Sequence, residues 1–231
     1  ADQIRAAMQA VGDIRAIRPM AEAEARSRGL LRLVPPAVDG AYVRRLLDLP
    51  ASAPAERQAL RILYTPLHGT GLRPVRTVLE RAGFPVEVVA EQAAPDPGFP
   101  TVAQPNPEDP GVYDIALRRA AAGAHDLILA TDPDADRLGV LVLDRRGGYR
   151  PLTGNQIGAI LTDQILRSRA AAGTLPGRGA VIKSIATSNL VVPLCREYGV
   201  TLLETHIGFK FIGDKIREFE ETGSHEFLFG F

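Results

Sequence analysis

Apolar residues follow two different periods along residues 60–143 of the chain. Short apolar runs predict buried strands at 60–64, 86–90, 127–130 and 138–143. Apolar residues three or four positions apart predict helices at 72–82, closed by Gly83, and at 113–122. Strands that alternate with helices in this way indicate an α/β domain with a largely parallel sheet.

A second α/β pattern begins after a turn-rich break at 144–151, where we predict a domain boundary. Thr153 and Gln156 stand three positions apart, as a capping box requires, and predict the start of a helix. The apolar face of that helix is predicted at Ile157, Ile160, Leu161 and Ile165. Further strands are predicted at 180–185, 200–204 and 227–231, and further helices at 189–198 and 211–220.

The sequence therefore predicts two consecutive α/β/α domains with mostly parallel sheets, over residues 1–145 and 152–231, the second of them truncated. The chain starts at Ala1 without a methionine and ends on the apolar run 227–231, which expects a following turn. We therefore expect an internal piece of a longer protein. A natural C-terminus docked in a sheet is the alternative interpretation.

The remaining segments give weaker signals. Residues 1–28 are rich in Ala, Arg and Glu and predict a helix that ends at Gly29, followed by a strand-like run at 30–34, a short helix at 41–49 and a loop at 50–54. A long loop then carries prolines at positions 95, 97, 100, 105, 107 and 110. Such a loop in a compact domain is usually functional or packed over an interface.

Composition narrows the function classes. Lys plus Arg and Asp plus Glu number 27 each, so the chain offers no bulk attraction to nucleic acid or to anionic membrane. No apolar run approaches the length of a membrane span, and no secretion signal is visible. The single cysteine, Cys195, rules out an intrachain disulfide, reads as a core residue and fits a reducing compartment, so we expect a cytoplasmic protein.

The strongest chemical signal is the sequence DPDADR at residues 132–137, directly after a predicted strand. Asp132, Asp134 and Asp136 alternate, so in an extended segment their side chains share a face. Three such carboxylates repel one another unless a cation pairs with them, and hard divalent cations prefer oxygen ligands. The pattern predicts a Mg²⁺ site at the carboxyl end of the strand, where α/β sheets place ligands.

Three other kinds of loop share part of this pattern. An EF-hand that opened at Asp132 would need Gly and Glu where the chain has Arg137 and Leu143, so it is rejected. A phosphatase of the haloacid-dehalogenase type also has D-x-D after a strand, but normally has Thr or Val where this chain has Asp136. A solvated acidic turn is the third. Arg137 could form a salt bridge to the aspartates or hold a phosphate, and both roles are compatible.

At this loop the sequence resembles the α-D-phosphohexomutases, the phosphoglucomutase/phosphomannomutase family, whose metal loop reads D-G-D-x-D-R or D-P-D-x-D-R. Other segments agree in the same order. They are YTPLHGTG at 64–71, PDPGFP at 95–100, PNPE at 105–108, GNQ at 154–156 and IGFKFI at 207–212. The resemblance covers essentially the whole chain and implies the second of four domains followed by most of the third.

The resemblance implies intramolecular phosphoryl transfer between C1 and C6 of a hexose phosphate, through a phosphoserine and a bisphosphate intermediate, with a pentose phosphate as the other candidate substrate. It implies Mg²⁺ on the three aspartates, with Arg137 and Lys210 as catalytic residues and Gly208 and Lys210 as substrate-binding residues. Ile207 stands where relatives usually carry Thr, which puts a hydroxyl contact there in doubt. Composition supports the assignment of Lys210. The chain has only three lysines, Lys183, Lys210 and Lys215, and a chain so poor in lysine is expected to keep it where arginine cannot replace it.

None of the six serines lies in the family's S-H-N-P nucleophile context, and the sugar-specificity segment would follow Phe231. The resemblance therefore implies that the first and fourth domains of the same protein complete the site. We expect this piece alone to be inactive and to bind Mg²⁺ weakly. A Mg²⁺-dependent phosphatase and a non-catalytic module that binds sugar phosphates are the alternatives.

Overall fold

The structure is a computed structural model that describes residues 2–49 and 54–231. The chain divides into two units, Ala1–Tyr42 and Val43–Phe231. The first contains α1 (Asp2–Val11), a 3-10 turn, η1 (Ile14–Ala16), α2 (Glu22–Ser27) and the start of α3 (Pro36–Leu47). None of residues 2–42 is buried. This segment therefore has no core of its own.

The prediction of one helix over residues 1–28 is wrong. Gly12 adopts a left-handed φ of 68°, which ends α1, and the chain turns again before α2 begins. The strand expected at 30–34 does not form, since no neighbouring strand pairs with it. Of the loop expected at 50–54, residues 50–53 lie outside the described part of the chain, and Pro54 begins α4 (Pro54–Ala59).

The first sheet, sheet A, has five strands in the order β2-β1-β3-β4-β5. The strands are β1 (Ile62–Thr65), β2 (Val86–Val88), β3 (Leu127–Thr131), β4 (Leu138–Leu143) and β5 (Tyr149–Leu152). The pairs β1–β2 and β1–β3 are parallel, whereas β3–β4 and β4–β5 are antiparallel, so the sheet is mixed. The predicted break at 144–151 thus contains most of a strand, and sheet A extends to Leu152.

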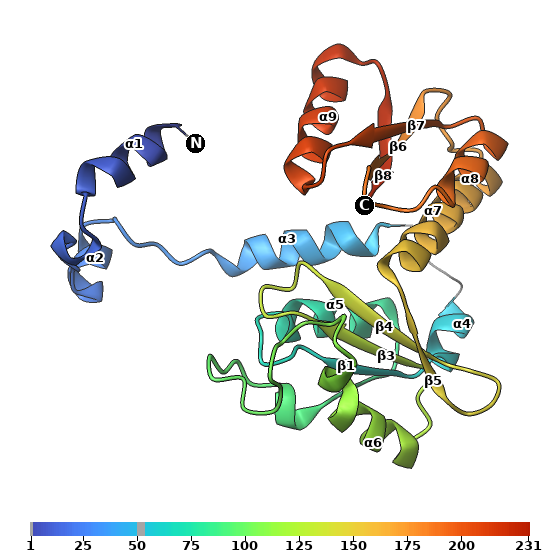
Figure 1. Cartoon of the computed structure of the whole chain (residues 1–231), viewed down its shortest axis with the longest axis horizontal. Coiled ribbons are helices and arrows are strands. Elements are labelled where there is room, and N and C mark those ends of the chain that lie inside the picture. The colour runs from blue at the N-terminus through green and yellow to red at the C-terminus, as the bar shows by residue number, and fades with distance from the viewer. Residues whose placement is uncertain (1, 50–53) are drawn as a thin grey trace. The chain divides into compact units, whose positions relative to one another are not determined.

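The helices of this domain are α5 (Leu72–Ala82), which ends at Gly83 as predicted, and α6 (Asp114–Ala122). Figure 1 shows them beside the sheet. Two 3-10 turns, η2 (Ala90–Gln92) and η3 (Pro110–Tyr113), interrupt the loops. The core joins residues of strands, of helix α6 and of the turns between the elements, namely Leu63, Leu67, Val89, Val112, Tyr113, Ala116, Ala120, Ile128, Ala130 and Leu141. Burial of these side chains is the main stabilising term for the domain.

The second sheet, sheet B, is parallel and has the order β7-β6-β8. Its strands are β6 (Gly179–Ser184), β7 (Thr201–Thr205) and β8 (Glu226–Gly230). Helices α7 (Gly154–Ala171) and α8 (Val191–Glu197) cover one face, and α9 (Phe209–Thr222) covers the other (Figure 1). Two clusters of buried apolar side chains, one of which includes Cys195, lie on the two faces of sheet B. They confirm an α/β/α domain.

Helix α7 begins with the predicted capping box, in which the Gln156 amide donates to Thr153 Oγ1 and the Thr153 amide donates to Gln156 Oε1. Its buried face differs from the prediction, because Ile160 and Leu161 are exposed. The buried residues are Gly158, Ala159, Thr162 and Leu166. A Cβ on Gly158 would lie 2.5 Å from the Phe231 ring, so small residues allow the close contact that sets this face.

Candidate metal centre

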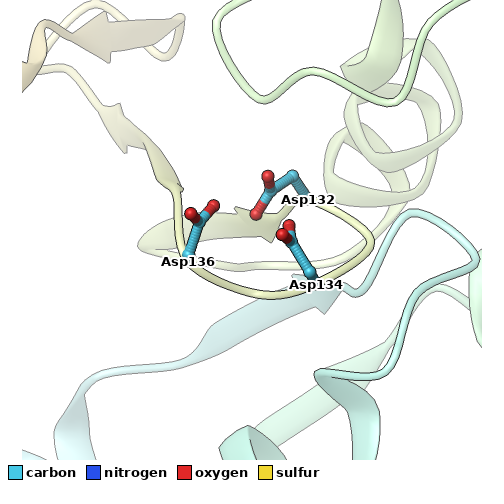
Figure 2. A group of neighbouring side chains, drawn as sticks. All are labelled: Asp132, Asp134 and Asp136. Carbon is cyan, nitrogen blue, oxygen red and sulfur yellow. The ribbon is translucent and has the colours of Figure 1, made fainter. Parts of the chain in front are cut away.

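The DPDADR segment is the loop of a hairpin between β3 and β4. Thr131 ends β3 and pairs with Leu138 at the start of β4, so both ends of the loop are fixed by the sheet. Asp132 is buried, whereas Asp134 and Asp136 are exposed. Figure 2 shows the three side chains directed toward a common space above the loop. One carboxylate oxygen from each lies within 4.8 Å of the others.

The loop closes through a tight turn. The Ala135 amide donates to the Asp132 carbonyl at 3.0 Å, and Ala135 itself takes a left-handed φ of 59°. Few residues other than Gly, Asn and Asp adopt this conformation, which costs roughly 1–2 kcal/mol. The turn brings Asp136 back toward Asp132, and this is how alternating residues converge on one point.

The carboxylates interact strongly with one another and with Arg137. The negative charge of Asp134, with burial and Asp132 adding to it, raises the pKa of Asp136 above its ordinary value. Burial alone would raise the pKa of Asp132, but hydrogen bonds from the backbone amide and side chain of Arg137 outweigh it and lower that pKa. The raised pKa of Asp136 indicates repulsion that a divalent cation would remove. The donor set therefore fits Mg²⁺.

Arg137 is held on both sides. Its Nε donates to Asp132 Oδ2 at 2.8 Å and its backbone amide donates to Asp132 Oδ1 at 2.9 Å. Its Nη1 donates to Oδ1 of Asn106 at 3.1 Å. The predicted salt bridge to the aspartates is confirmed, and the side chain is still 54% exposed, which leaves the guanidinium accessible to an anion.

Gly208 and Lys210 lie in the other α/β domain, where β7 leads into α9. Gly208 precedes the first turn of α9 with a φ of 124°, a conformation that glycine adopts readily. Lys210 is exposed, with its Nζ 4.8 Å from the centre of the Phe211 ring. The exposed backbone and ammonium group at a helix N-terminus are suited to bind an anion.

Sequence reasoning did not single out Lys183, which is fully buried on β6. Its Nζ lies 2.9 Å from Glu204 Oε1 on the neighbouring strand β7 and donates to the Thr187 carbonyl at 3.3 Å. The available signal was the rarity of lysine in this chain, which did not distinguish Lys183 from the other two. Asn106 was noted only as part of PNPE, because its contact with Arg137 spans 31 positions.

Two sequence profiles match the chain. They are phosphoglucomutase/phosphomannomutase, alpha/beta/alpha domain II, over residues 40–147, and the corresponding domain III over residues 153–231. The fold and the carboxylate loop thus define a pair of phosphosugar-mutase domains. The chain belongs to the phosphoglucomutase/phosphomannomutase family.

Relatives with assigned names agree with this family. The chain is 36% identical over 196 residues to a phosphoglucomutase of Staphylococcus haemolyticus, covering 84% of this chain and 34% of the relative. It is 35% identical over 170 residues to a probable phosphoribomutase of Schizosaccharomyces pombe, covering 73% of this chain and 29% of the relative. The chain therefore spans about a third of the length of these relatives.

Solved structures share the fold. A phosphoglucomutase/phosphomannomutase family protein from Burkholderia thailandensis superposes with a TM-score of 0.62 at 20% identity, covering 78% of this chain and 36% of that one. An N-acetylphosphoglucosamine mutase from Aspergillus fumigatus, in complex with GlcNAc-6P and magnesium, superposes with a TM-score of 0.53 at 15% identity. The match covers 77% of this chain and 35% of that one. No helix in the part of the chain that the structure describes is long and apolar enough to cross a membrane.

Proposed function

We propose that this chain is the metal-binding and sugar-binding middle of a phosphosugar mutase, an isomerase that moves a phosphoryl group between two positions of a hexose or pentose phosphate. The observation that carries the proposal is the convergence of three carboxylates on a hairpin loop in a chain of this family. The proposal assigns this loop to the second of four domains and residues 153–231 to the third. We expect the protein in the cytoplasm.

The proposed cofactor is Mg²⁺, held by Asp132, Asp134 and Asp136. When bound, Mg²⁺ would supply positive charge against the oxygens of the transferring phosphoryl group. The buried carboxylate of Asp132 anchors the loop, and the two exposed carboxylates complete the donor set. A further ligand, the phosphoserine oxygen, would come from another domain of the whole protein, so the chain alone binds the metal weakly.

The proposed role of Arg137 is to bind the transferring phosphoryl group. A guanidinium presents several N–H donors in a fixed plane, which matches phosphate geometry. Its contacts with Asp132 and Asn106 orient that plane before substrate arrives. The group therefore loses little conformational freedom on binding, which favours stabilisation of the transition state.

The proposed roles of Gly208 and Lys210 concern the sugar phosphate. The lack of a side chain at Gly208 lets a ligand approach the backbone amides at the start of α9. Lys210 supplies a positive charge and a donor near that point, suited to hold the phosphate or to donate a proton to the leaving oxygen. The sugar itself would be one of the hexose or pentose phosphates.

The proposal is tested by calorimetric titration of the 231-residue chain with Mg²⁺ and by activity of the whole protein. We expect weak, millimolar binding that Asp134→Asn abolishes, and no turnover by the chain alone. In the whole protein, Asp134→Asn, Arg137→Ala and Lys210→Met should each lower kcat by about 10²-fold or more, the order of other electrostatic catalytic contacts. Micromolar Mg²⁺ binding, or release of inorganic phosphate by the chain alone, would contradict it, the latter in favour of a phosphatase.

A further inference from the structure

A turn at residues 66–71, between β1 and α5, lies directly against the metal loop. Strands β1 and β3 are parallel neighbours, and Thr65 pairs with Ala130, so the segments that follow them emerge at the same edge of sheet A. The Thr70 amide donates to the Pro133 carbonyl at 2.8 Å, and Thr70 Oγ1 donates to the same oxygen at 3.0 Å. Pro133 stands between two of the candidate ligands, Asp132 and Asp134.

The contact leaves no room for a side chain at Gly69 or Gly71. A Cβ on Gly69 would overlap the Pro133 backbone, with the carbonyl oxygen at 2.6 Å. A Cβ on Gly71 would lie 2.6 Å from both Thr131 Oγ1 and the Tyr64 hydroxyl, which are 2.8 Å apart and hydrogen-bonded in the interior. The turn and the metal loop are therefore packed backbone against backbone.

The turn is also strained. Leu67 and His68 are consecutive residues with φ values of 46° and 61°, and each such non-glycine residue costs roughly 1–2 kcal/mol. The surroundings compensate: the Leu67 amide donates to Thr65 Oγ1 at 3.1 Å, and the buried Leu67 side chain packs in the core. Strain that persists because neighbours over-determine it occurs typically at functional sites.

The His68 ring contributes to this restraint. Its Nε2 lies 2.8 Å from Thr101 Oγ1 and its Nδ1 lies 3.2 Å from the Ala94 carbonyl, so the imidazole is fixed against the proline-rich loop. The backbone amide of His68 donates to the Gln92 carbonyl at 2.9 Å. The turn is thus anchored in the domain on one side and contacts the metal loop on the other.

We propose that the 66–71 turn is a rigid support that sets the spacing of Asp132 and Asp134, with Thr70 as the positioning residue and Gly69 as the residue that permits the contact. Proline has no amide hydrogen, so the carbonyl is the only backbone hydrogen-bonding group of Pro133. Two donors from Thr70 fix that carbonyl, and with it the peptide that separates the two carboxylates. The inference rests on the proposed function, because it assumes that these carboxylates bind the metal.

The test measures Mn²⁺ and Mg²⁺ affinity of the whole protein, by electron paramagnetic resonance and calorimetry. Thr70→Val keeps the shape and removes the hydroxyl, and we expect it to raise the metal Kd about 3–10-fold, the equivalent of one hydrogen bond. Thr70→Ser should have a metal Kd within about twofold of the unaltered protein's value, because serine keeps the hydroxyl donor. Gly69→Ala should raise the Kd by more than about tenfold, because overpacking displaces the Pro133 backbone.

Thr222→Val is the matched control, since Thr222 Oγ1 also donates to a backbone carbonyl, that of Glu218, at 2.6 Å, in the other domain. It should leave the metal Kd unchanged. Activity gives a second measurement: Thr70→Val should lose rate at limiting Mg²⁺ and recover kcat at saturating Mg²⁺. A merely structural role would lower the melting temperature without this dependence on metal concentration.

Asp134→Asn separates a failure of the proposed function from a failure of the support role of the turn. If Asp134→Asn binds metal as the unaltered protein does, the metal site and the proposed function fail together. If Asp134→Asn abolishes binding while Thr70→Val and Gly69→Ala keep the original Kd, the proposed function stands and the support role of the turn is overturned.

Discussion

Nη1 of Arg137 donates a hydrogen bond to Oδ1 of Asn106 at 3.1 Å. The same oxygen accepts the Glu108 amide at 3.1 Å, which closes a turn of the proline-rich loop. One side-chain amide therefore links the PNPE segment to the guanidinium beside the candidate metal ligands. This contact, together with the contacts of His68 to Thr101 and of Tyr113 to Pro107, holds the proline-rich loop next to the site.

Replacement of Asn106 by Ala should release Arg137 on one side. We expect kcat/KM of the whole protein to fall about fivefold, equivalent to a net loss of about 1 kcal/mol for one hydrogen bond. Asn106→Asp is the matched control, because a carboxylate still accepts from both donors, and it should retain most of the activity. Equal losses in both variants would mean that the contact does not orient Arg137.

Asp132 and Asp136 should have opposite effects on stability when no metal is present. Asp132 accepts two hydrogen bonds from Arg137 while buried, so Asp132→Ala should lower the free energy of unfolding by about 2–3 kcal/mol. The pKa of Asp136 is raised, which means that its charge opposes folding near neutral pH. Asp136→Asn should therefore raise the melting temperature in a chelator.

Added Mg²⁺ should reverse the order of stability of the unaltered chain and Asp136→Asn. The unaltered chain gains stability from a ligand that binds only the folded state, whereas Asp136→Asn has lost one metal ligand and gains less. Thermal unfolding with and without Mg²⁺ measures both effects. An Asp136→Asn protein that is less stable than the unaltered chain in chelator would contradict the repulsion inferred from the pKa.

Much of the architecture could be predicted because apolar periodicity records burial directly. The runs that became β1, β3 and β6 are largely buried, whereas β4 is buried only at Gly139 and Leu141. The bounds of these four strands lie within two residues of the predictions. The prediction failed at Tyr149–Leu152, which lies behind the glycines of a turn and is only half apolar. Its pairing with β4 makes it a strand, and that is a tertiary property.

The site could be predicted to a similar extent. The three aspartates were found because both ends of their loop are strands, which fixes the alternation of side chains in space. The contacts of Thr70 and Asn106 could not be found, because each reaches the loop across 31 positions or more, and no local pattern encodes such a distance. The face of α7 was missed because glycine and alanine at the contact carry little hydrophobic signal.

Gly139 on β4 should tolerate no side chain. A Cβ there would overlap the Tyr113 hydroxyl and lie 2.7 Å from the Pro107 carbonyl, to which that hydroxyl donates at 2.8 Å. We expect Gly139→Ala to destabilise the chain by about 1–3 kcal/mol. Tyr113→Phe removes the obstructing oxygen, so the double variant should be more stable than the sum of the single effects predicts.

Denaturant unfolding of the four proteins in this cycle measures the coupling. Additive effects would show that the Pro107 carbonyl, and not the tyrosine hydroxyl, excludes the added carbon. Ala122→Gly, at the last residue of α6, provides a comparison with an ordinary helical substitution. It should cost less than about 1 kcal/mol, the value for a helix interior.

Asp144 should give the stability of the chain part of its dependence on acid pH. Its carboxylate accepts from Arg150 Nε at 2.6 Å and from the amides of Arg146 and Gly148, and these bonds lower its pKa. A lowered folded-state pKa stabilises the fold above the unfolded value near 3.8, and this contribution is lost as pH falls through the folded value. Asp144→Asn should therefore flatten the decline in stability below about pH 4.

The measurement is the free energy of unfolding against pH for Asp144→Asn and for Glu220→Gln, which alters an exposed carboxylate on α9. The two proteins should differ most near neutral pH and converge in acid. A constant difference at all pH values would mean that the turn needs the hydrogen bonds but not the charge.

The pairing of Thr131 with Leu138 across the hairpin has a consequence for how this protein can change over time. The six residues 132–137 must bridge two strands whose alignment is already set by the rest of the sheet. An inserted or deleted residue would either bulge the loop or slip β4 by one position, which would turn its buried side chains outward. Substitutions can therefore change the chemistry of the loop one residue at a time, whereas any change of its length disturbs the loop or the sheet.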